Sequence, residues 1–176
     1  MATTEFIAAI ELGSSKITGV AGRKNSDGSM QVLAYAQEAF CLGSQSQGEE
    51  QTLASLMDLV KEGVFIAQAL VRRGGSCSRS LSCLAADHRR ALRQLSAAYF
   101  LITGQRYHPP TPSVVINASL PLALRDQFVW EQRWERANQQ AAETTSDACL
   151  KELYQELAQD GVLHAATIRS LLEQMG

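Results

Sequence analysis

The sequence predicts an α/β chain, with an antiparallel β-meander at the N-terminus and a mostly helical region after it. Three short apolar segments, 6–10, 17–22 and 31–36, are separated by turns too short to hold a crossover helix, so neighbouring strands should pair antiparallel. From about residue 53 onward, apolar residues recur at the three-to-four spacing of amphipathic helices. The 176 residues, 45% of them hydrophobic and 19% charged, suffice for one core and a small appendage.

The strands of the predicted meander are bounded by glycine turns. Residues 6–10 are apolar and lie between a polar start and a glycine turn, which is typical of a buried strand. Gly13 lies where this turn needs a positive φ or a close backbone approach. The dipeptide Asp27-Gly28 is a strong hairpin signal before the third strand, residues 31–36.

A first helix is expected over residues 53–71, whose apolar positions form one face. Gly63 within it costs about 1 kcal/mol relative to alanine, which favours a kink or a close packing contact there. The glycine- and serine-rich run 74–80 breaks the helical pattern. The expected organisation is an N-terminal fragment (1–72), a linker or boundary (73–86) and a mostly helical region (87–176).

Further helices are expected in the last part of the chain. Asp87 is a candidate N-cap for a helix that ends at Gly104. The proline-rich run 108–112 excludes regular structure, and residues 113–117 form a brief strand or an extended connector. Three closing helices are expected over residues 124–141, 150–157 and 165–175, the second capped at Ser146 or Asp147 and the third entered through a turn at Asp160-Gly161.

Neither the cysteines nor the histidines predict a zinc site. No Cys-x-x-Cys pair occurs, and the three histidines lie far apart in the sequence. His88 and His108 have no nearby nucleophile, so no catalytic set can be assembled from the chain order. Trp130 and Trp134 stand at i and i+4 on one helix face, which favours core or interface anchors over a cofactor site.

The turn after the first strand has the composition of a phosphate cradle. Backbone N–H groups of a tight turn carry partial positive charge, and hydroxyls and a lysine would add donors and one full charge. These residues are Gly13, Ser14, Ser15 and Lys16. Glu11 at the end of the strand would orient a magnesium ion, directly or through water. An ordinary hairpin with a polar turn is the alternative, and the Walker phosphate-loop pattern is absent.

The turn lies within the segment Ala9-Ile-Glu-Leu-Gly-Ser-Ser-Lys-Ile-Thr-Gly-Val-Ala-Gly22. This segment resembles the first phosphate motif of the actin, heat-shock chaperone and sugar-kinase superfamily. In that motif, a hydrophobic strand is followed by Asp-x-Gly-Thr/Ser-x-Lys/Ser and then by a second strand. The wider stretch, residues 6–35, is most similar to the bacterial cell-division actins of the FtsA family. The resemblance implies an actin-like meander, ATP with Mg²⁺ at the first hairpin, and the tubulin-like division protein FtsZ as partner.

The chain departs from that family in several places. Glu11 stands where the superfamily usually has aspartate, and the resemblance ends at about Ala36. The second phosphate motif of the family and its adenosine-binding glycine pair have no counterpart in this sequence. We therefore expect only one half of the nucleotide-binding clamp and no complete set of ATPase motifs. FtsA ends in an amphipathic membrane helix with basic flanks. Here His164 and Arg169 are the only candidate cations of the last helix, so direct membrane insertion is not expected.

Charge is unevenly distributed although the formal net charge is only −2. Between residues 72 and 106, seven arginines accompany one acid, Asp87. Such a band can meet nucleic acid, an anionic membrane or an acidic partner. No aromatic ladder interleaves the arginines as single-strand binders require, which favours a solvated face. The seven are Arg72, Arg73, Arg79, Arg89, Arg90, Arg93 and Arg106.

Three hypotheses about function remain. The first is an FtsA-like protein related to cell division, truncated or rearranged, which binds FtsZ or a second copy of itself. The second is a non-enzymatic interaction domain on an actin-like scaffold. The third is a small protein that associates with nucleic acid through the arginine band. A fused or disrupted reading frame is compatible with all three. No catalytic residue is predicted, and a cytoplasmic location is expected because no basic segment precedes the first apolar run.

Overall fold

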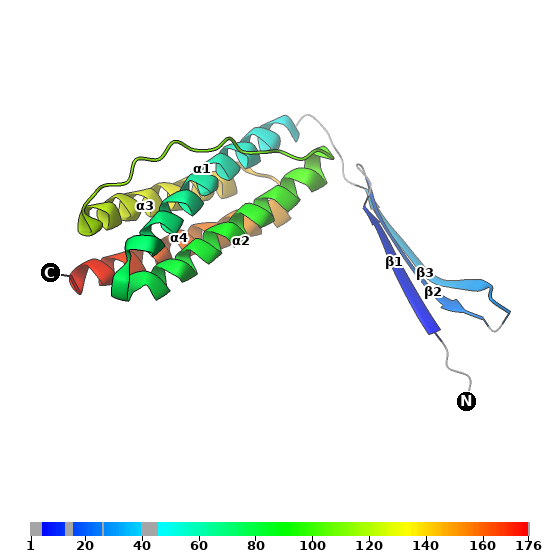
Figure 1. Cartoon of the computed structure of the whole chain (residues 1–176). Coiled ribbons are helices and arrows are strands. Elements are labelled where there is room, and N and C mark those ends of the chain that lie inside the picture. The colour runs from blue at the N-terminus through cyan, green and yellow to red at the C-terminus, as the bar shows by residue number, and fades with distance from the viewer. Residues whose placement is uncertain (1–4, 13–15, 26, 40–45, 176) are drawn as a thin grey trace.

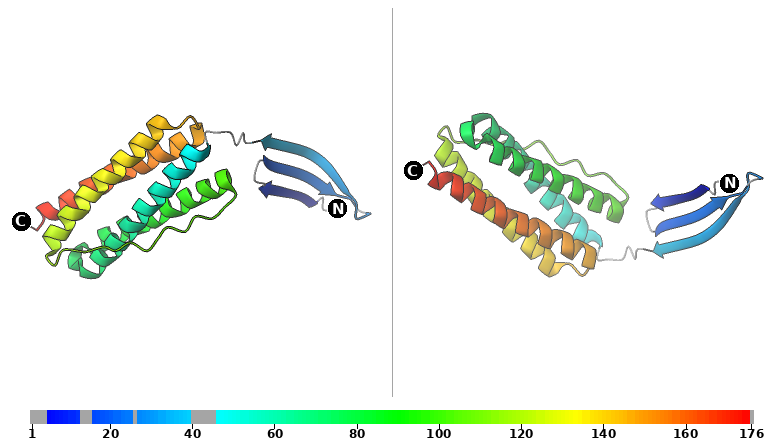
Figure 2. Two further views of the ribbon diagram at one scale, coloured as in Figure 1. Left: turned by 90° about the horizontal axis from the view of Figure 1, so that it is seen from above. Right: turned by 90° about the horizontal axis from the view of Figure 1, so that it is seen from below.

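The chain forms a small antiparallel sheet and a bundle of four long helices (Figure 1). The structure, a computed structural model, describes residues 5–12, 16–25, 27–39 and 46–175. The fold class predicted from the sequence, an antiparallel meander followed by a mostly helical region, is confirmed. Views from above and below show the sheet beside one end of the bundle rather than packed on a helix face (Figure 2).

The meander consists of β1 (Glu5–Leu12), β2 (Lys16–Lys24) and β3 (Met30–Ala39), in the spatial order β1-β2-β3. Both neighbouring pairs are antiparallel, with Ala8 of β1 opposite Ala21 of β2. Consecutive strands therefore lie next to each other, as the short turns of the sequence require.

The turn between β2 and β3 follows the predicted Asp27-Gly28 signal. The Asp27 carboxylate accepts a hydrogen bond from the backbone N–H of Ser29 at 2.9 Å, which closes the turn. Gly28 adopts a φ of 84°, which residues with a Cβ rarely adopt. Local turn chemistry therefore determines this hairpin.

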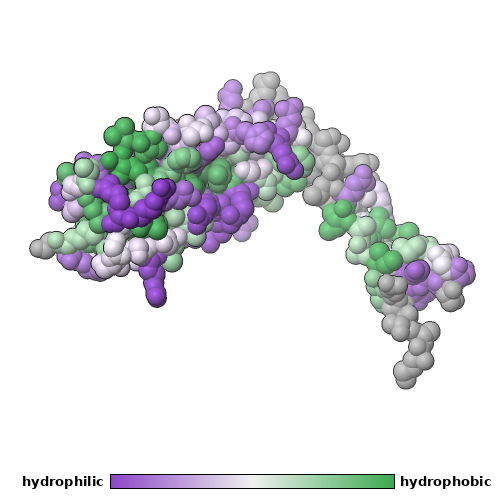
Figure 3. Space-filling view, in the orientation of Figure 1, coloured by the Kyte–Doolittle hydropathy of each residue, from purple (hydrophilic) through white to green (hydrophobic). Residues whose placement is uncertain are grey.

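The apolar side chains of the sheet are exposed, which corrects the expectation of a buried first strand. Phe6 is 71% exposed and Ile10 is 75% exposed, and Val32 in β3 is also largely accessible. The space-filling view shows hydrophobic surface on the sheet (Figure 3). An apolar strand is buried only when a second layer packs on its sheet, and no described helix lies over this one (Figures 1 and 2).

The bundle is built from two helical hairpins. The first pairs α1 (Ser46–Arg73) with α2 (Ser78–Thr103) through the 3₁₀ turn η1 (Gly75–Cys77). The second pairs α3 (Leu120–Thr144) with α4 (Ala148–Glu173). The hairpins meet where α1 packs on α3 and α2 contacts α4. None of the described helices combines the length and the apolar character that a membrane span needs.

Helix α2 begins earlier than expected. It starts at Ser78 rather than at Asp87, so residues 78–86, which were expected to form a linker or boundary, are helical. Leu81 and Leu84 in this stretch are buried, and their contacts with the core outweigh the serine-rich composition. Asp87 consequently lies inside the helix and cannot serve as its N-cap.

A long crossover segment, residues 104–119, carries the chain from α2 to α3 along the outside of the bundle (Figure 1). It begins at Gly104, whose φ of 69° ends α2 as predicted. Residues 113–117 form the expected extended connector without strand pairing. Hydrogen bonds hold the crossover segment against α1. The Tyr107 hydroxyl donates to Asp58 at 2.9 Å. Lys61 donates to the Pro109 carbonyl, and Arg73 donates to the Asn117 carbonyl at 2.7 Å.

Helix α4 is continuous, which corrects the expected turn at Asp160-Gly161 and the expected pair of short helices. A Cβ on residue 161 would lie 3.2 Å from Cδ1 of Trp134 and 3.3 Å from the carbonyl oxygen of Glu131. Glycine at this position permits a close approach of α4 to α3. The expected cap at Asp147 is confirmed, since its carboxylate accepts a hydrogen bond from the Leu150 N–H at 2.9 Å.

A second glycine contact brings α1 close to α3. A Cβ on Gly63 would lie 2.3 Å from Cη2 of Trp130, which confirms the close-contact alternative for this glycine. Trp130 and Trp134 are both buried, and their stacked rings lie 6.0 Å apart. Their predicted role as core anchors is confirmed.

Replacing Gly63 by alanine should destabilise the bundle by about 1–3 kcal/mol, because the added methyl would overlap the large, buried indole ring of Trp130. Urea unfolding followed by circular dichroism measures this change. The matched control is Gly48→Ala on the same helix, where no atom lies within 4 Å of the position that an added Cβ would take. Helix propensity alone predicts a gain of up to about 1 kcal/mol for the control. Equal stabilities of the two variants would contradict the contact.

Candidate metal centre

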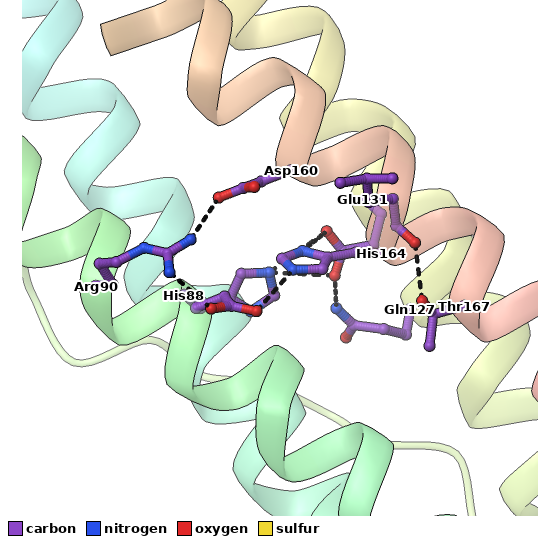
Figure 4. A network of polar contacts seen from close by, with 9 residues as sticks. His88, Arg90, Gln127, Glu131, Asp160, His164 and Thr167 are labelled. Atoms are coloured by element: carbon purple, nitrogen blue, oxygen red, sulfur yellow. Dashed lines mark hydrogen bonds and ion pairs between the residues drawn. The ribbon is translucent and has the colours of Figure 1, made fainter.

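Three buried polar side chains meet in the core of the bundle, each from a different helix (Figure 4). His88 comes from α2, Glu131 from α3 and His164 from α4, and their exposed fractions are 0%, 0% and 8%. Each side chain lies on the core-facing side of its helix. For His88 this side is the row Leu81, Leu84, His88, Ala91 and Leu95, which keeps the three-to-four spacing of a buried face.

Glu131 lies between the two imidazoles. His88 Nε2 is 3.2 Å from Glu131 Oε1, and His164 Nδ1 is 3.4 Å from Glu131 Oε2. The second contact lacks the alignment of a hydrogen bond, because His164 Nδ1 has no hydrogen-bond partner among the described residues. One ligand atom from each residue can be chosen so that all three lie within 4.8 Å of one another.

Separations of this size suit a shared metal ion. Two protein ligands that bind zinc at about 2.0–2.2 Å with tetrahedral angles lie about 3.3 Å apart. The two nitrogen–oxygen separations at Glu131, 3.2 and 3.4 Å, match this value. Imidazole nitrogens and a carboxylate oxygen are also common ligands of zinc and of non-haem iron. The three side chains are therefore close enough to converge on one divalent ion, although the two short separations involve different oxygens of Glu131.

The other ring nitrogen of His164 faces an outer carboxylate. His164 Nε2 lies 3.4 Å from Asp87 Oδ2. A contact of this kind orients a metal-binding histidine, here with Nε2 toward the carboxylate and Nδ1 toward the ion. Asp87 is in turn paired with Arg90 at 3.2 Å, and Arg90 is paired with Asp160 at 3.0 Å. Figure 4 shows this chain of contacts leading from the centre to the edge of the bundle.

Gln127 and Trp130 pack against the centre from α3. The Gln127 side-chain amide donates a hydrogen bond to Glu131 Oε1 at 2.6 Å. The Trp130 ring meets the His88 ring edge-on, with centroids 4.9 Å apart. Among the described residues, His88 Nδ1, Gln127 Oε1 and Trp130 Nε1 are buried without hydrogen-bond partners. The centre is thus surrounded by buried side chains, and these carry polar atoms that no described residue satisfies.

The contacts shift the pKa values of two members in opposite directions. Burial alone would raise the pKa of Glu131, but the close contacts and charges of His164 and His88 lower it. Burial alone would lower the pKa of His164, but the close contact and charge of Glu131, followed by those of Asp87, raise it. The metal-free centre therefore favours an ionised carboxylate beside a protonated imidazole. A divalent ion would have to displace that proton.

Two of the residues predicted from the sequence to hold phosphate and magnesium, Glu11 and Lys16, lie in the sheet. Glu11 is exposed near the end of β1. Lys16 begins β2, while Gly13, Ser14 and Ser15 lie outside the described residues. The phosphate cradle stays a prediction.

The sequence does not predict the candidate metal centre, because its histidines lie far apart along the chain. The fold brings two of them to one carboxylate from separate helices. A weak signal was present, since His88, Glu131 and His164 are polar residues at positions where their helices otherwise carry core side chains. Such positions mark candidates, but the pattern within one helix cannot show that they meet.

Two of the seven arginines in the basic band are held by internal contacts. Arg73 donates to the carbonyl of Asn117 at 2.7 Å, and Arg90 is paired with Asp87 and Asp160. These contacts support the solvated-face interpretation for this part of the band. Nucleic-acid binding through the other arginines stays a prediction.

Comparison of the chain with protein-family models, with curated proteins and with solved structures finds no match. Its function is accordingly inferred from the side chains of the centre and of the sheet.

The two pKa shifts predict how the stability of the metal-free protein depends on pH. The contribution of His164 to the free energy of unfolding is complete below its ordinary pKa of 6.5 and is lost as pH rises through the raised pKa of the folded state. The contribution of Glu131 to the free energy of unfolding is complete above its ordinary pKa of 4.5 and is lost as pH falls through the lowered pKa of the folded state.

The combined contribution should therefore be largest between pH 4.5 and 6.5. Urea unfolding in the presence of a chelator, repeated across pH, measures this contribution as the difference in the free energy of unfolding between the wild type and His164→Gln. We expect this difference to shrink as pH rises above 6.5. A difference that stays constant over that range would contradict the proposed charge state of His164.

Proposed function

We propose that the helical bundle binds one divalent transition-metal ion at His88, Glu131 and His164. The observation that supports this proposal is the meeting of three buried ligand atoms from three helices within 4.8 Å. Buried charges are costly unless they are paired or coordinate a metal. The carboxylate and the imidazoles of this cluster are placed to do both, as an ion triad in the metal-free protein and as ligands in the loaded one.

The ligand set favours a reactive centre over a purely structural one. Structural zinc sites are usually closed by four protein ligands, whereas catalytic zinc sites have three and keep a position for water or substrate. Two histidines and one carboxylate are also the ligands of many non-haem iron(II) centres. Under this proposal, the bound ion keeps at least one position for a small exogenous ligand such as water.

A single ion fits the site better than a pair. Two hairpins joined by one long crossover form the connectivity of ferritin-like bundles, in which two ions are held by a Glu from each of two helices and a Glu-x-x-His motif from each of the others. Here Ala85 and Gly161 stand three residues before His88 and His164, and neither offers a ligand. At Gly161 the space for a side chain is taken by Trp134.

Calorimetric titration with Zn²⁺ at neutral pH should give one ion per chain. His88→Ala and His164→Ala should each weaken binding by more than the roughly 10–100-fold that the loss of an outer partner costs. Asp87→Asn should weaken binding by about 10–100-fold, because it removes only the partner of His164 Nε2.

His108→Ala is the matched control for these variants. His108 is exposed in the crossover segment, so its loss should leave the affinity unchanged. The proposal fails if the wild type takes up no ion, or if His108→Ala weakens binding as much as the buried histidine variants do.

A second candidate function concerns the sheet. We infer from the FtsA resemblance that the meander docks on a cytoplasmic, tubulin-like FtsZ protein. Exposed apolar side chains such as Ile7 and Val32, which the strand register places on one face of the sheet through Gly22, support this inference, because exposed apolar surface marks interaction sites. Self-association through the same surface is the alternative. The same proposal assigns ATP phosphates and Mg²⁺ to the turn formed by Glu11, Gly13, Ser14, Ser15 and Lys16.

Co-sedimentation with FtsZ polymers tests the docking role. The wild type should pellet with the polymers, and Val32→Asp should reduce the pelleted fraction because it places a charge on the apolar surface. Equal pelleting with and without FtsZ polymer would instead indicate self-association and would remove FtsZ as partner.

Calorimetry with Mg-ATP tests the phosphate site, where Lys16→Ala should abolish any binding heat.

A further inference from the structure

A pocket of about 250 Å³ lies between the crossover segment and the helices α1 and α3. Residues 113–117 cover it from the crossover side, and Ile66 contributes apolar surface from α1. Its polar lining comes from Glu62 on α1, from Asp126, Gln127 and Trp130 on α3, and from Ser113 and Asn117 of the crossover segment.

Two residues of this lining also contact the proposed metal centre. Gln127 donates to Glu131 Oε1 at 2.6 Å, and the Trp130 ring lies 4.9 Å from the His88 ring. Both side chains are almost completely buried. One layer of side chains therefore separates the pocket from the centre.

The same two residues carry polar atoms that lack a partner. Gln127 Oε1 and Trp130 Nε1 are buried and form no hydrogen bond with any described residue. Buried polar groups in native proteins are generally satisfied by protein, water or ligand. An amide oxygen can bind a divalent cation directly, and an indole N–H can donate to a water molecule that such a cation carries.

The outer part of the pocket carries negative charge. Glu62 and Asp126 both line it, and both are at least partly accessible. The nearby Arg133 approaches Glu62 only to 3.7 Å and is itself 67% exposed, so it neutralises the carboxylate weakly. Carboxylates at the opening of a cleft raise the local concentration of cations.

We propose that this pocket is a transit site through which a hydrated divalent cation reaches the buried centre. The inference rests on the proposed metal site. Glu62 and Asp126 attract the ion, and Gln127 Oε1 binds it, while Trp130 donates to one of its waters. Movement of the Gln127 side chain, which already contacts Glu131, then passes the ion to the centre.

The opposite approach to the centre is less suited to a cation. Its most accessible member, His164, is reached past Asp87, and the guanidinium of Arg90 bridges Asp87 and Asp160 there. An incoming cation would meet this positive charge and would have to break two ion pairs. The lining of the pocket between the crossover segment and α3 contains two carboxylates and no cationic side chain, and the cations that contact it, Arg133 and Arg73, bind at Glu62 and at the Asn117 carbonyl.

Stopped-flow loading with Co²⁺ tests the route. Quenching of tryptophan fluorescence reports arrival of the ion, because Trp130 contacts a ligand of the centre. The double variant Glu62→Gln/Asp126→Asn should load about tenfold more slowly than the wild type, within the range by which charged clefts alter association rates. The affinity at equilibrium should change much less, because neither side chain belongs to the metal-binding triad.

Two further variants make the result specific. Glu143→Gln/Glu152→Gln removes the same charge from exposed positions outside the pocket and should load like the wild type. Val114→Trp narrows the pocket without a change in charge and should also slow loading. Arg90→Ala should have little effect on the rate.

The inference is overturned if both pocket variants load as fast as the Glu143/Glu152 control, or if Arg90→Ala alone accelerates loading. In either case normal equilibrium binding would leave the metal centre itself intact. If the wild type binds no Co²⁺ at equilibrium, the metal centre fails and the transit site fails with it. The two failures are therefore distinguished by the equilibrium titration.

Discussion

The interior of the bundle depends on one buried charge, the carboxylate of Glu131. A buried carboxylate without partners is strongly destabilising, so α2 and α4 must bring His88 and His164 to it. Gln127 adds a hydrogen bond at 2.6 Å from the same helix. The requirement that stabilises the metal-free protein also brings two imidazole nitrogens close to one carboxylate, so that one ligand atom from each residue lies within 4.8 Å of the others. Stability and the proposed function thus share the same atoms.

Two glycines make that arrangement geometrically accessible. Gly63 lets α1 approach the Trp130 ring, and Gly161 lets α4 approach Trp134 and the backbone of Glu131. A larger residue at either position would separate the helices. The close approach of α4 to α3 lies one helical turn from His164, so the contact at Gly161 helps to set the reach of that imidazole toward the carboxylate. Close packing and ligand geometry are consequently coupled in this bundle.

The sheet presents the opposite physical situation. Its strands carry apolar residues typical of a buried layer, yet Phe6 and Ile10 are exposed and no described helix lies over them. Strand β2 is hydrogen-bonded to a neighbour on both sides, whereas β1 and β3 are edge strands that pair with β2 alone, and apolar side chains of the sheet are exposed. The bundle therefore has its proposed chemistry in its core, and the sheet has its proposed role on its surface. A docking role for the sheet and a metal centre in the bundle are compatible because they use different residues.

Features that arise within a few neighbouring residues could be predicted from the amino-acid order alone. The short turns required the antiparallel meander, Asp27-Gly28 formed its second turn, and Gly104 ended α2. The three-to-four spacing identified α1 and the buried face with the two tryptophans. Other features depend on residues from elsewhere in the chain, and they emerge only when the helices pack. In the sequence, Gly161 indicates a turn, and only the packed structure shows that it makes room for Trp134. In the same way, the sequence shows His88 and His164 as separate residues, and only the packed helices place Glu131 between them. Local patterns encode periodicity and turns, whereas a packing contact or a ligand set exists only when separate helices meet.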